Sequence, residues 1–388
     1  MKVPARKKTA YERTVRKEMV GMEAATGNIK LPKYRGRKRT KSFSIKVGST
    51  CTGAGTTEFA LEDLIEVNSG NGPEVSYDVA FACEKQDYVA EFYKSHFKTE
   101  CFIDNAFNGL HEDAPEVDLY SVGWPCQSFS ISGHQQGEDD QRAQVIYPVL
   151  NYIRDKVPKC FFLENVENLT TKFRDHFEWL LNELIHFTRD GGEPAYEVRW
   201  RILDSAEHGS AQTRKRVYVV GLRTDCIVRP FIWPEPMDTP PLKNFLDKGG
   251  IAAGRTRYPP RQQVTANKNV KAVYDLLAKR GINARKHDVM IDTDGGRPSY
   301  SLGRVGTITA SRAGGLSYWI TSRNRRVSLK ELLRLQGFDP KRINLEAASP
   351  RQIGIILGNA FTVTVVRRLL SKMLPAVDLA PENFSDGL

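Results

Sequence analysis

Three features that mark other classes of protein are missing from this 388-residue sequence. No apolar run approaches the roughly 18 residues that a membrane-spanning helix needs, and the N-terminus is charged where a signal peptide is apolar. The six cysteines form no Cys-x-x-Cys pair and no metal-ligand cluster, which argues against a zinc site and a disulfide framework. We therefore expect a soluble intracellular protein with reduced thiols, no metal and no membrane contact.

Positive charge is concentrated at the N-terminus. Residues 1–41 hold 14 Lys or Arg and three Glu, which accounts for the whole net charge of +11 and leaves the rest of the chain formally neutral. We assign residues 1–42 to a basic arm. Such an arm suits phosphate neutralisation on nucleic acid or nuclear import, and a solvated disordered tail fits equally well.

Strand-like and helix-like segments alternate after the arm. The strand patterns, several of them followed by helical periodicity, lie at residues 43–47, 75–82, 117–122, 160–163 and 216–221. This order predicts an α/β fold with a parallel, doubly wound sheet, whose ligands bind at the carboxyl ends of the strands.

Prolines break this periodicity from about residue 224 to residue 303, where basic residues outnumber acidic ones 13 to 8. Helical patterns resume near residue 328. We therefore expect a first domain at 43–223, an inserted loop-rich module at 224–327, and a segment at 328–388 that completes the first domain.

Polar residues follow the ends of the first predicted strands. Gly53 and Gly55 form a glycine turn, which is a weak signal for nucleotide binding by itself. Glu84 ends the next strand, where α/β nucleoside sites place an acidic residue on ribose hydroxyls, and Asp104 could take an adenine amino group. Each carboxylate could equally be a helix cap or a surface charge.

Cys126 follows another predicted strand, between Pro125 and a glutamine, and precedes a polar stretch able to close over a substrate. A buried free cysteine is usually an inert apolar residue, but one at an accessible sheet edge suits a nucleophile. Glu164 follows the neighbouring strand and could face Cys126, or it could cap the next helix.

These segments together resemble the ordered motifs of the cytosine-5 DNA methyltransferases of bacterial and phage restriction-modification type, over residues 43–370. The five motifs are Gly-Trp-Pro-Cys-Gln-Ser-Phe-Ser-Ile-Ser-Gly at 123–133, Glu-Asn-Val at 164–166, Gln-Thr-Arg-Lys-Arg-Val at 212–217, Arg-Leu-Gln-Gly-Phe at 334–338 and Gly-Asn-Ala at 358–360. The resemblance implies a Rossmann-like S-adenosyl-L-methionine-dependent methyltransferase sheet, with a small target-recognition domain inserted at 224–327.

The implied reaction is DNA (cytosine-5-)-methyltransfer from S-adenosyl-L-methionine to a cytosine flipped out of the duplex. Cys126 matches the thiolate that adds to carbon 6, and Glu164 matches the acid that supports ring nitrogen 3. Arg214 and Arg216 match the paired arginines that reach the flipped base and the adjacent backbone, with Arg216 the better match for the cytosine carbonyl oxygen.

The resemblance also implies a set of cofactor contacts. They are Cys51, Thr52, Gly53, Gly55, Glu84, Asp104, Asn105, Pro125 and Asn359. Two positions depart from the family pattern, because Cys51 stands where an aromatic residue is usual and Lys85 where a bulky apolar residue is common. Both glycines of the first motif are kept, which favours a working cofactor site.

Double-stranded DNA is the implied partner. Phosphate or guanine contacts are expected from basic residues of the inserted module, namely Arg255, Arg257, Arg261, Arg285 and Lys286. We expect a monomer without an obligate protein partner, cytoplasmic and nucleoid-associated, or nuclear in a eukaryote; the compact chain favours a bacterial, archaeal or viral source. Two alternatives stay open: a transfer-RNA cytosine-5 methyltransferase, and a DNA-binding relative that has lost catalysis.

Overall fold

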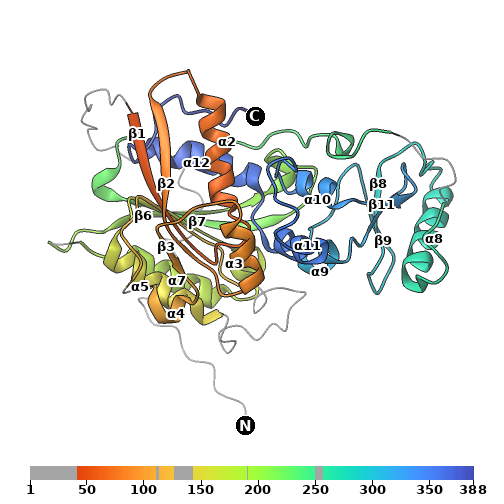
Figure 1. Cartoon of the computed structure of the whole chain (residues 1–388), viewed down its shortest axis with the longest axis horizontal. Helices are drawn as coiled ribbons and strands as arrows, with labels where there is room; N and C mark the ends of the chain where they lie inside the picture. The colour runs from red at the N-terminus through yellow and green to blue at the C-terminus, as the bar shows by residue number, and fades with distance from the viewer. Residues whose placement is uncertain (1–41, 111–112, 126–142, 190, 250–256) are drawn as a thin grey trace, which may run out of the picture.

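The computed structural model describes residues 42–110, 113–125, 143–189, 191–249 and 257–388. These residues form two lobes that lie side by side (Figure 1). We call the described residues of 42–249 and 328–388 the sheet lobe, and residues 257–326 the second lobe.

A seven-stranded sheet in the order β3-β2-β1-β4-β5-β7-β6 forms the centre of the sheet lobe. Its strands are β1 (Ser42–Thr50), β2 (Glu74–Cys83), β3 (Cys101–Ile103), β4 (Leu119–Val122), β5 (Cys160–Val166), β6 (Tyr196–Asp204) and β7 (Lys215–Arg223). The first five strands run parallel, β7 is antiparallel to β5, and β6 is antiparallel to β7. The predicted Rossmann-like α/β sheet is confirmed. The strand expected at 216–221 is β7, but it runs antiparallel rather than parallel, and β6 was not predicted.

Apolar side chains cover both faces of this sheet. Every residue of β5 is buried, as expected for a central strand with helices on both sides. Neighbouring residues of β5 point to opposite faces, so Phe162 joins one hydrophobic core and Phe161 the other. The carboxyl ends of the parallel strands therefore meet at one edge between two layers of helices.

Helices of the sheet lobe lie on both faces of the sheet and between the sheet and the second lobe (Figure 1). They are α2 (Thr56–Asn68), α3 (Asp87–Lys94), α4 (Ala106–Gly109), α5 (Ile146–Lys156), α6 (Asn168–Thr171), α7 (Arg174–Ile185), α10 (Leu329–Leu335), α11 (Pro350–Asn359) and α12 (Val363–Ala376), with short 3-10 turns η2 (Ala143–Val145), η3 (Ser205–Glu207), η4 (Thr224–Cys226) and η5 (Leu242–Phe245). α12 packs against α2, so the end of the chain returns to the first helix.

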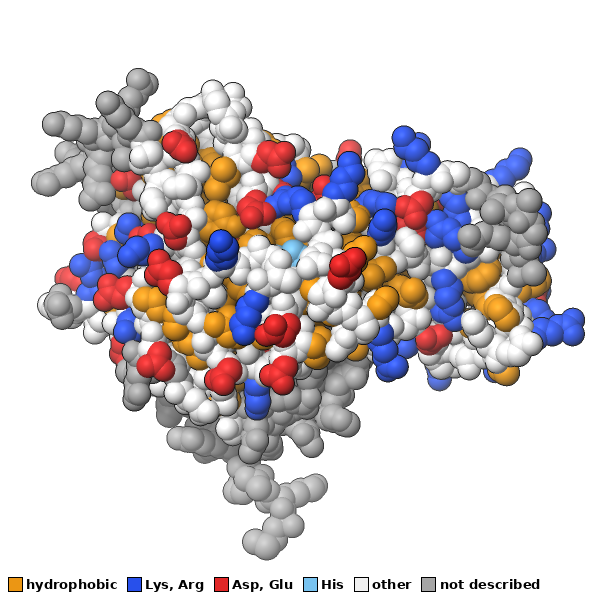
Figure 2. Space-filling model, in the orientation of Figure 1, with side chains coloured by type: hydrophobic (Ala, Val, Ile, Leu, Met, Phe, Trp, Pro, Cys, Tyr) orange, Lys and Arg blue, Asp and Glu red, His pale blue; other side chains and the backbone are white. Residues whose placement is uncertain are grey.

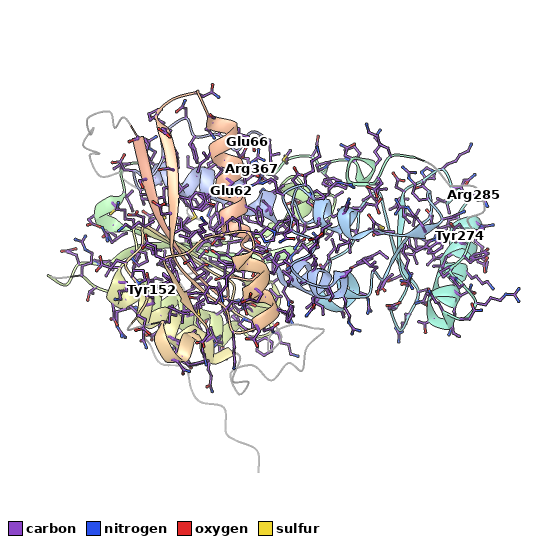
Figure 3. The ribbon with its side chains drawn as sticks, viewed as in Figure 1. Glu62, Glu66, Tyr152, Tyr274, Arg285 and Arg367 are labelled. Atoms are coloured by element: carbon purple, nitrogen blue, oxygen red, sulfur yellow. The ribbon has the colours of Figure 1, made fainter. Side chains whose placement is uncertain are left out.

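Ion pairs also hold the C-terminal part of the chain against α2. Arg342 contacts both Glu62 and Asp63 of α2, and Arg367 of α12 lies 3.8 Å from Asp63. Figure 3 shows Glu62 and Arg367 close together where the two helices meet. Among the described residues no single helix is long and apolar enough to cross a membrane; α11 and α12 pass that test only as a bent pair, and both are largely buried in the sheet lobe.

The second lobe contains a four-stranded antiparallel sheet in the order β11-β10-β8-β9. The strands are β8 (Val289–Asp292), β9 (Ser299–Leu302), β10 (Tyr318–Ile320) and β11 (Arg325–Arg326), and the helices are α8 (Val264–Lys279) and α9 (Ala310–Gly314). Val273 and Leu277 of α8 pack on Val289 and Ile291 of β8 in a small core of their own.

This lobe differs from the loop-rich module expected at 224–327. Residues 224–249 pack on the sheet lobe instead, where Phe231 and Trp233 are buried in the main core. The backbone N–H of Val228 donates to the Ala376 carbonyl in the same stretch. Proline breaks helices and central strands, but it does not prevent an extended segment from lying on a core.

The two lobes meet where α9 packs against α11. A side-chain carbon added to Gly354 or Gly358 of α11 would overlap the backbone of Ala313 or Ala310. Glycine is therefore required at both positions, because only a bare backbone allows the two helices to approach this closely.

Candidate active site

The residues expected to act lie along the edge where the parallel strands end. The turn at Cys51 follows β1, Glu84 follows β2, Asp104 follows β3, Pro125 follows β4, and Glu164 lies near the end of β5. Open α/β sheets bind ligands at this edge. Cys126, the remaining residues up to 142, Arg255 and the basic arm lie outside the described residues.

The turn after β1 has an unusual backbone. Cys51, Gly53 and Gly55 have φ angles of 54°, 59° and 74°. Positive φ is costly for cysteine, so Cys51 is held there by the structure around it. A Cβ at Gly55 would collide with the Phe97 ring, so this glycine also permits close packing. Burial raises the pKa of the Cys51 thiol, which favours the neutral form.

Thr52 fastens this turn to the end of β2. Its hydroxyl accepts from the Cys83 N–H at 3.1 Å and can donate its one hydrogen to the carbonyl oxygen of Cys83 at 3.2 Å or of Ser49 at 3.3 Å. The Thr52 main chain is engaged as well, since its N–H donates to the Cys83 carbonyl at 3.1 Å and its carbonyl accepts from the Gly55 N–H at 3.2 Å, so Thr52 fixes the shape of the turn.

Glu84 holds the same turn from the other side. Its Oε2 accepts from the Gly53 N–H at 3.2 Å and its Oε1 from the Gln86 N–H at 3.0 Å. Burial raises the pKa of Glu84, and the backbone hydrogen bonds act in the opposite direction. Each carboxylate oxygen keeps a second lone pair, so the site fits two neighbouring ribose hydroxyls of a nucleoside.

The other expected cofactor residues are more open. Asp104 and Asn359 are exposed, and Pro125 is half-buried at the end of β4. Asn105 caps α4, since its side-chain oxygen accepts from the Phe107 N–H at 3.1 Å. Among the described residues no group of three or more His, Cys, Asp or Glu side chains could hold a metal ion.

Glu164 and Arg216 face each other across β5 and β7. Arg216 Nε lies 3.1 Å from Glu164 Oε1, an ion-pair distance, but the approach is not that of a hydrogen bond. Glu164 is only 6% exposed, and Oε1 has no hydrogen-bond partner in the described structure. Burial raises the pKa of Glu164, while the charges of Arg216 and Arg214 oppose that rise. A buried carboxyl oxygen without a hydrogen bond is costly unless a ligand completes it.

Asn165 connects Glu164's strand to the chain that leads to Cys126. Its Nδ2 donates to the Trp124 carbonyl oxygen at 3.4 Å, and its Oδ1 accepts from the Val166 N–H at 2.8 Å. Trp124 is buried two residues before Cys126. The end of β5 therefore helps to position the segment after β4.

Arg214 lies elsewhere than the sequence led us to expect. Its guanidinium is 3% exposed and donates to three main-chain carbonyls, those of Ile308 at 3.0 Å, Gly358 at 3.3 Å and Ala360 at 2.8 Å. These hydrogen bonds join the start of β7 to the second lobe and to the end of α11. In this structure its terminal nitrogens bind protein backbone.

Two buried glutamines extend this junction. Gln212 Nε2 donates to Gln336 Oε1 at 2.6 Å, and Gln212 Oε1 accepts from the Ile308 N–H at 2.9 Å. Gln336 Nε2 donates to the Ala360 carbonyl at 2.8 Å. Gln212 and Gln336 belong to two of the sequence motifs, but no role was predicted for either. Their side-chain amides, which both donate and accept hydrogen bonds, were the only hint in the sequence.

The far end of the second lobe carries unpaired positive charge. No described carboxylate lies within ion-pair distance of any member of this basic patch, which comprises the exposed Arg257, Arg261, Lys268, Lys271, Lys279, Arg280, Arg285 and Lys286. The Arg257 guanidinium lies 4.4 Å from the centroid of the Tyr274 ring. Figure 2 shows Lys and Arg side chains out to this end, and Figure 3 places Arg285 beside Tyr274 there.

Comparison with known proteins gives consistent matches over most of the chain. The family described as C-5 cytosine-specific DNA methylase matches residues 45–374. The type II methyltransferase M.NgoBI of Neisseria gonorrhoeae is 29% identical over 314 residues, covering 76% of this chain and 87% of that protein. The type II methyltransferase M.HhaI of Haemophilus parahaemolyticus is 23% identical over 315 residues, covering 78% and 90%.

Solved structures share the fold at lower identity. The Entamoeba histolytica methyltransferase EhMeth matches with a TM-score of 0.56 and 19% identity, over 87% of this chain and 99% of that one. The S. pombe Dnmt2 methyltransferase matches with a TM-score of 0.51 and 16% identity, over 85% and 98%. At these identities the likeness shows a common fold.

Proposed function

Because this chain belongs to the C-5 cytosine-specific DNA methylase family, whose methyl donor is S-adenosyl-L-methionine, we propose that it methylates carbon 5 of cytosine within a specific duplex DNA sequence. Its relatives M.NgoBI and M.HhaI are named as type II methyltransferases, and we propose the same restriction-modification role here.

The observation that carries this proposal is the buried Glu164 carboxyl, whose Oε1 is ion-paired with Arg216 but receives no hydrogen bond in the described structure. An acid whose pKa is raised by burial can hold a proton and donate it towards ring nitrogen 3 of cytosine. Arg216, 3.1 Å from that oxygen, is suited to the neighbouring carbonyl oxygen of the base. Both side chains thus recognise one edge of a cytosine.

Cys126 is the proposed nucleophile, four residues beyond the end of β4. Its thiolate sulfur forms a bond to carbon 6, and the displaced ring electrons make carbon 5 nucleophilic. The bound cofactor supplies an electrophilic methyl group. Loss of the proton from carbon 5 then expels the thiolate and restores the ring. The hydrogen bond from Asn165 to the Trp124 carbonyl supports this placement, because it fixes the chain just before Cys126.

The cofactor residues remain those proposed from the sequence, with roles that the geometry refines. Glu84 is the candidate for the ribose hydroxyls, because each of its oxygens keeps acceptor capacity. The turn of Cys51, Thr52, Gly53 and Gly55 is proposed to border the cofactor beside Glu84, to which the Gly53 N–H ties it. The remaining proposed contacts are Asp104, Asn105, Pro125 and Asn359.

Duplex DNA must release its cytosine into the site, at a cost of a few kcal/mol that contacts elsewhere offset. The basic patch is our candidate for phosphate contacts, because its cations have no carboxylate partner in the described structure. Arg214 we assign to positioning, since it holds the junction through three carbonyls. A phosphate role for the N-terminal arm stays a prediction.

The decisive experiment measures tritium transfer from labelled S-adenosyl-L-methionine to duplex DNA and, in parallel, to total transfer RNA. Wild-type protein should label DNA, while Cys126→Ser should bind DNA and transfer no label because it lacks the thiolate. Glu164→Gln should lower the rate at least 100-fold.

Three results would contradict the proposal in different ways. Label in RNA alone would change the substrate, full activity of Cys126→Ser would remove the nucleophile, and label in neither polymer would favour a DNA-binding protein without catalysis.

A further inference from the structure

A cavity of about 610 Å³ lies in the second lobe, between its sheet and residues 305–312. Hydroxyl-bearing side chains make up much of its lining, and one ion pair stands among them. Thr307 contributes one of these hydroxyls, and Asp292 and Arg312 form the ion pair. A lining of this kind suits a polar, hydrogen-bonding ligand.

Arg312 is held rigidly in this cavity by Asp292. Arg312 Nε donates to Asp292 Oδ2 at 2.9 Å. The other oxygen of Asp292 accepts from the N–H groups of Asp294 at 2.9 Å and Gly295 at 3.0 Å, so the carboxylate cannot turn freely. No described residue accepts a hydrogen bond from Arg312 Nη1 or Nη2. The guanidinium thus presents a fixed and unused pair of donors.

The cavity wall is connected to the catalytic edge of the large sheet. Thr307 Oγ1 donates to the Thr213 carbonyl at 3.0 Å, and the next residue, Ile308, accepts from Arg214 at 3.0 Å. Thr213 and Arg214 lead directly into β7, which carries Arg216. A group bound by Arg312 is therefore held at a fixed offset from the proposed cytosine pocket.

The charge of the cavity selects between a phosphate and a base edge. Asp292 neutralises Arg312 and would repel a phosphate anion brought into the cavity. A base edge is uncharged, and guanine offers two acceptors in the major groove, O6 and N7, that match two parallel guanidinium donors. The cations of the basic patch have no carboxylate within ion-pair distance in the part of the chain that the structure describes, so this patch suits phosphates.

We propose that Arg312, oriented by Asp292, reads a guanine of the DNA target sequence. The inference rests on the proposed function and makes it more specific, because it names one residue and one base.

The first experiment compares the site preference of wild-type protein, Arg312→Ala and Arg312→Lys on a library of random duplexes, read by bisulfite sequencing. At one guanine position, wild type should prefer guanine by roughly tenfold to hundredfold over other bases. Both variants should lose that preference, because neither offers two fixed parallel donors. The other positions of the target should keep theirs.

A second experiment replaces that guanine by 7-deazaguanine, which lacks the N7 acceptor. Wild-type kcat/KM should fall about tenfold or more, whereas Arg312→Ala should respond to the change by less than twofold. Arg280→Ala in the basic patch is the matched control, since it should weaken binding to all sequences equally and leave the base preference intact.

An unrelaxed target sequence in both Arg312 variants, or equal sensitivity of wild type and Arg312→Ala to 7-deazaguanine, would overturn the assignment while leaving the proposed function in place. Failure of wild-type protein to methylate any duplex in the library would instead contradict the proposed function, and the inference with it.

Discussion

The two parts of the molecule carry opposite charge. Residues 42–249 and 328–388, which include the sheet lobe, contain 28 basic and 39 acidic residues, a formal charge of −11. Residues 257–326, the second lobe, contain 14 basic and 4 acidic residues, a formal charge of +10. The chain beyond the arm is neutral only because the negative charge of one lobe cancels the positive charge of the other. A polyanion approaching such a molecule is repelled by one part and attracted by the other, which orients it before binding.

The two parts also differ in what their cations touch. In the sheet lobe Arg154 lies 2.9 Å from Asp155, Lys159 2.8 Å from Asp118, and Arg174 2.6 Å from Glu178. The basic patch of the second lobe has no such pairs in the part of the chain that the structure describes. The ion-paired Lys and Arg side chains of the sheet lobe neutralise carboxylates of the same lobe. The Lys and Arg side chains of the basic patch have no such partner among the described residues and are available to a ligand.

The largest expected effect separates an arginine that joins the two lobes, Arg214, from one proposed to bind the cytosine, Arg216. The two residues lie two positions apart in the sequence. Arg214→Ala should lower the free energy of unfolding by roughly 3–5 kcal/mol, because it leaves three carbonyls at the lobe junction without their donor. Denaturant unfolding would measure this decrease. Arg216→Ala, the control, should abolish most methyl transfer with a decrease in stability of only about 1 kcal/mol.

If both substitutions reduced stability equally, the Arg216–Glu164 ion pair would contribute as much to stability as the hydrogen bonds of Arg214 at the junction. If Arg214→Ala left the free energy of unfolding unchanged, its hydrogen bonds would contribute nothing to joining the lobes.

A smaller effect is expected from Glu58, a carboxyl buried within the acidic lobe. It is 1% exposed in α2 and accepts from the Tyr93 hydroxyl at 2.8 Å, and burial raises its pKa from 4.5 to about 7. Because the folded-state pKa is raised, the protonated group's contribution to stability is fully present below pH 4.5 and is lost as the pH rises through 7. The decrease amounts to roughly 3 kcal/mol.

Glu58→Gln should remove this part of the pH dependence, so that its stability relative to wild type increases between about pH 5 and pH 8 in denaturant unfolding. Exposed Glu74→Gln is the matched control and should change little. If the free energy of unfolding changed with pH in the same way for Glu58→Gln and wild type, the ionisation of Glu58 would not destabilise the folded protein.

The smallest effect concerns binding to DNA through the basic patch. Replacing Lys268, Lys271 and Arg280 by Gln should reduce the slope of log affinity against log salt by up to about 0.9 for each phosphate that the variant no longer neutralises. Fluorescence anisotropy at several salt concentrations would measure it. The control is the double variant Arg154→Gln, Arg174→Gln in the sheet lobe, which should leave this slope unchanged. If both variants reduced the slope equally, ion-paired and unpaired cations would contribute alike to DNA binding.

Sequence patterns predicted the parallel strands because those strands are buried on both faces. β5 is an uninterrupted buried run, and its position could be stated from the sequence. β6 escaped notice because it is the edge strand and most of its side chains are half-buried, which weakens the apolar signal. β8 to β11 are two to four residues long, too short for a periodicity to develop.

Site residues at the ends of predicted strands could be predicted from the sequence. Contacts between residues far apart in the sequence could not. Glu164 and Arg216 lie on neighbouring strands, and the structure brings them together. The partners of Arg214 lie 94 to 146 residues away in sequence, at Ile308, Gly358 and Ala360. Arg312 was not singled out, because a cavity formed by separate short elements leaves no local pattern.

The junction between the lobes has an evolutionary consequence. Arg214 and the Gln336 amide nitrogen bind carbonyl oxygens of the main chain, and α9 meets α11 at bare glycine backbone. Every amino acid supplies a carbonyl, so the residues that accept these hydrogen bonds can vary, whereas the donors Arg214 and Gln336 and the glycines of α11 cannot. If the second lobe reads the target sequence, as we propose for Arg312, substitutions at its carbonyl-bearing positions could alter that reading while the hydrogen bonds to the sheet lobe are kept.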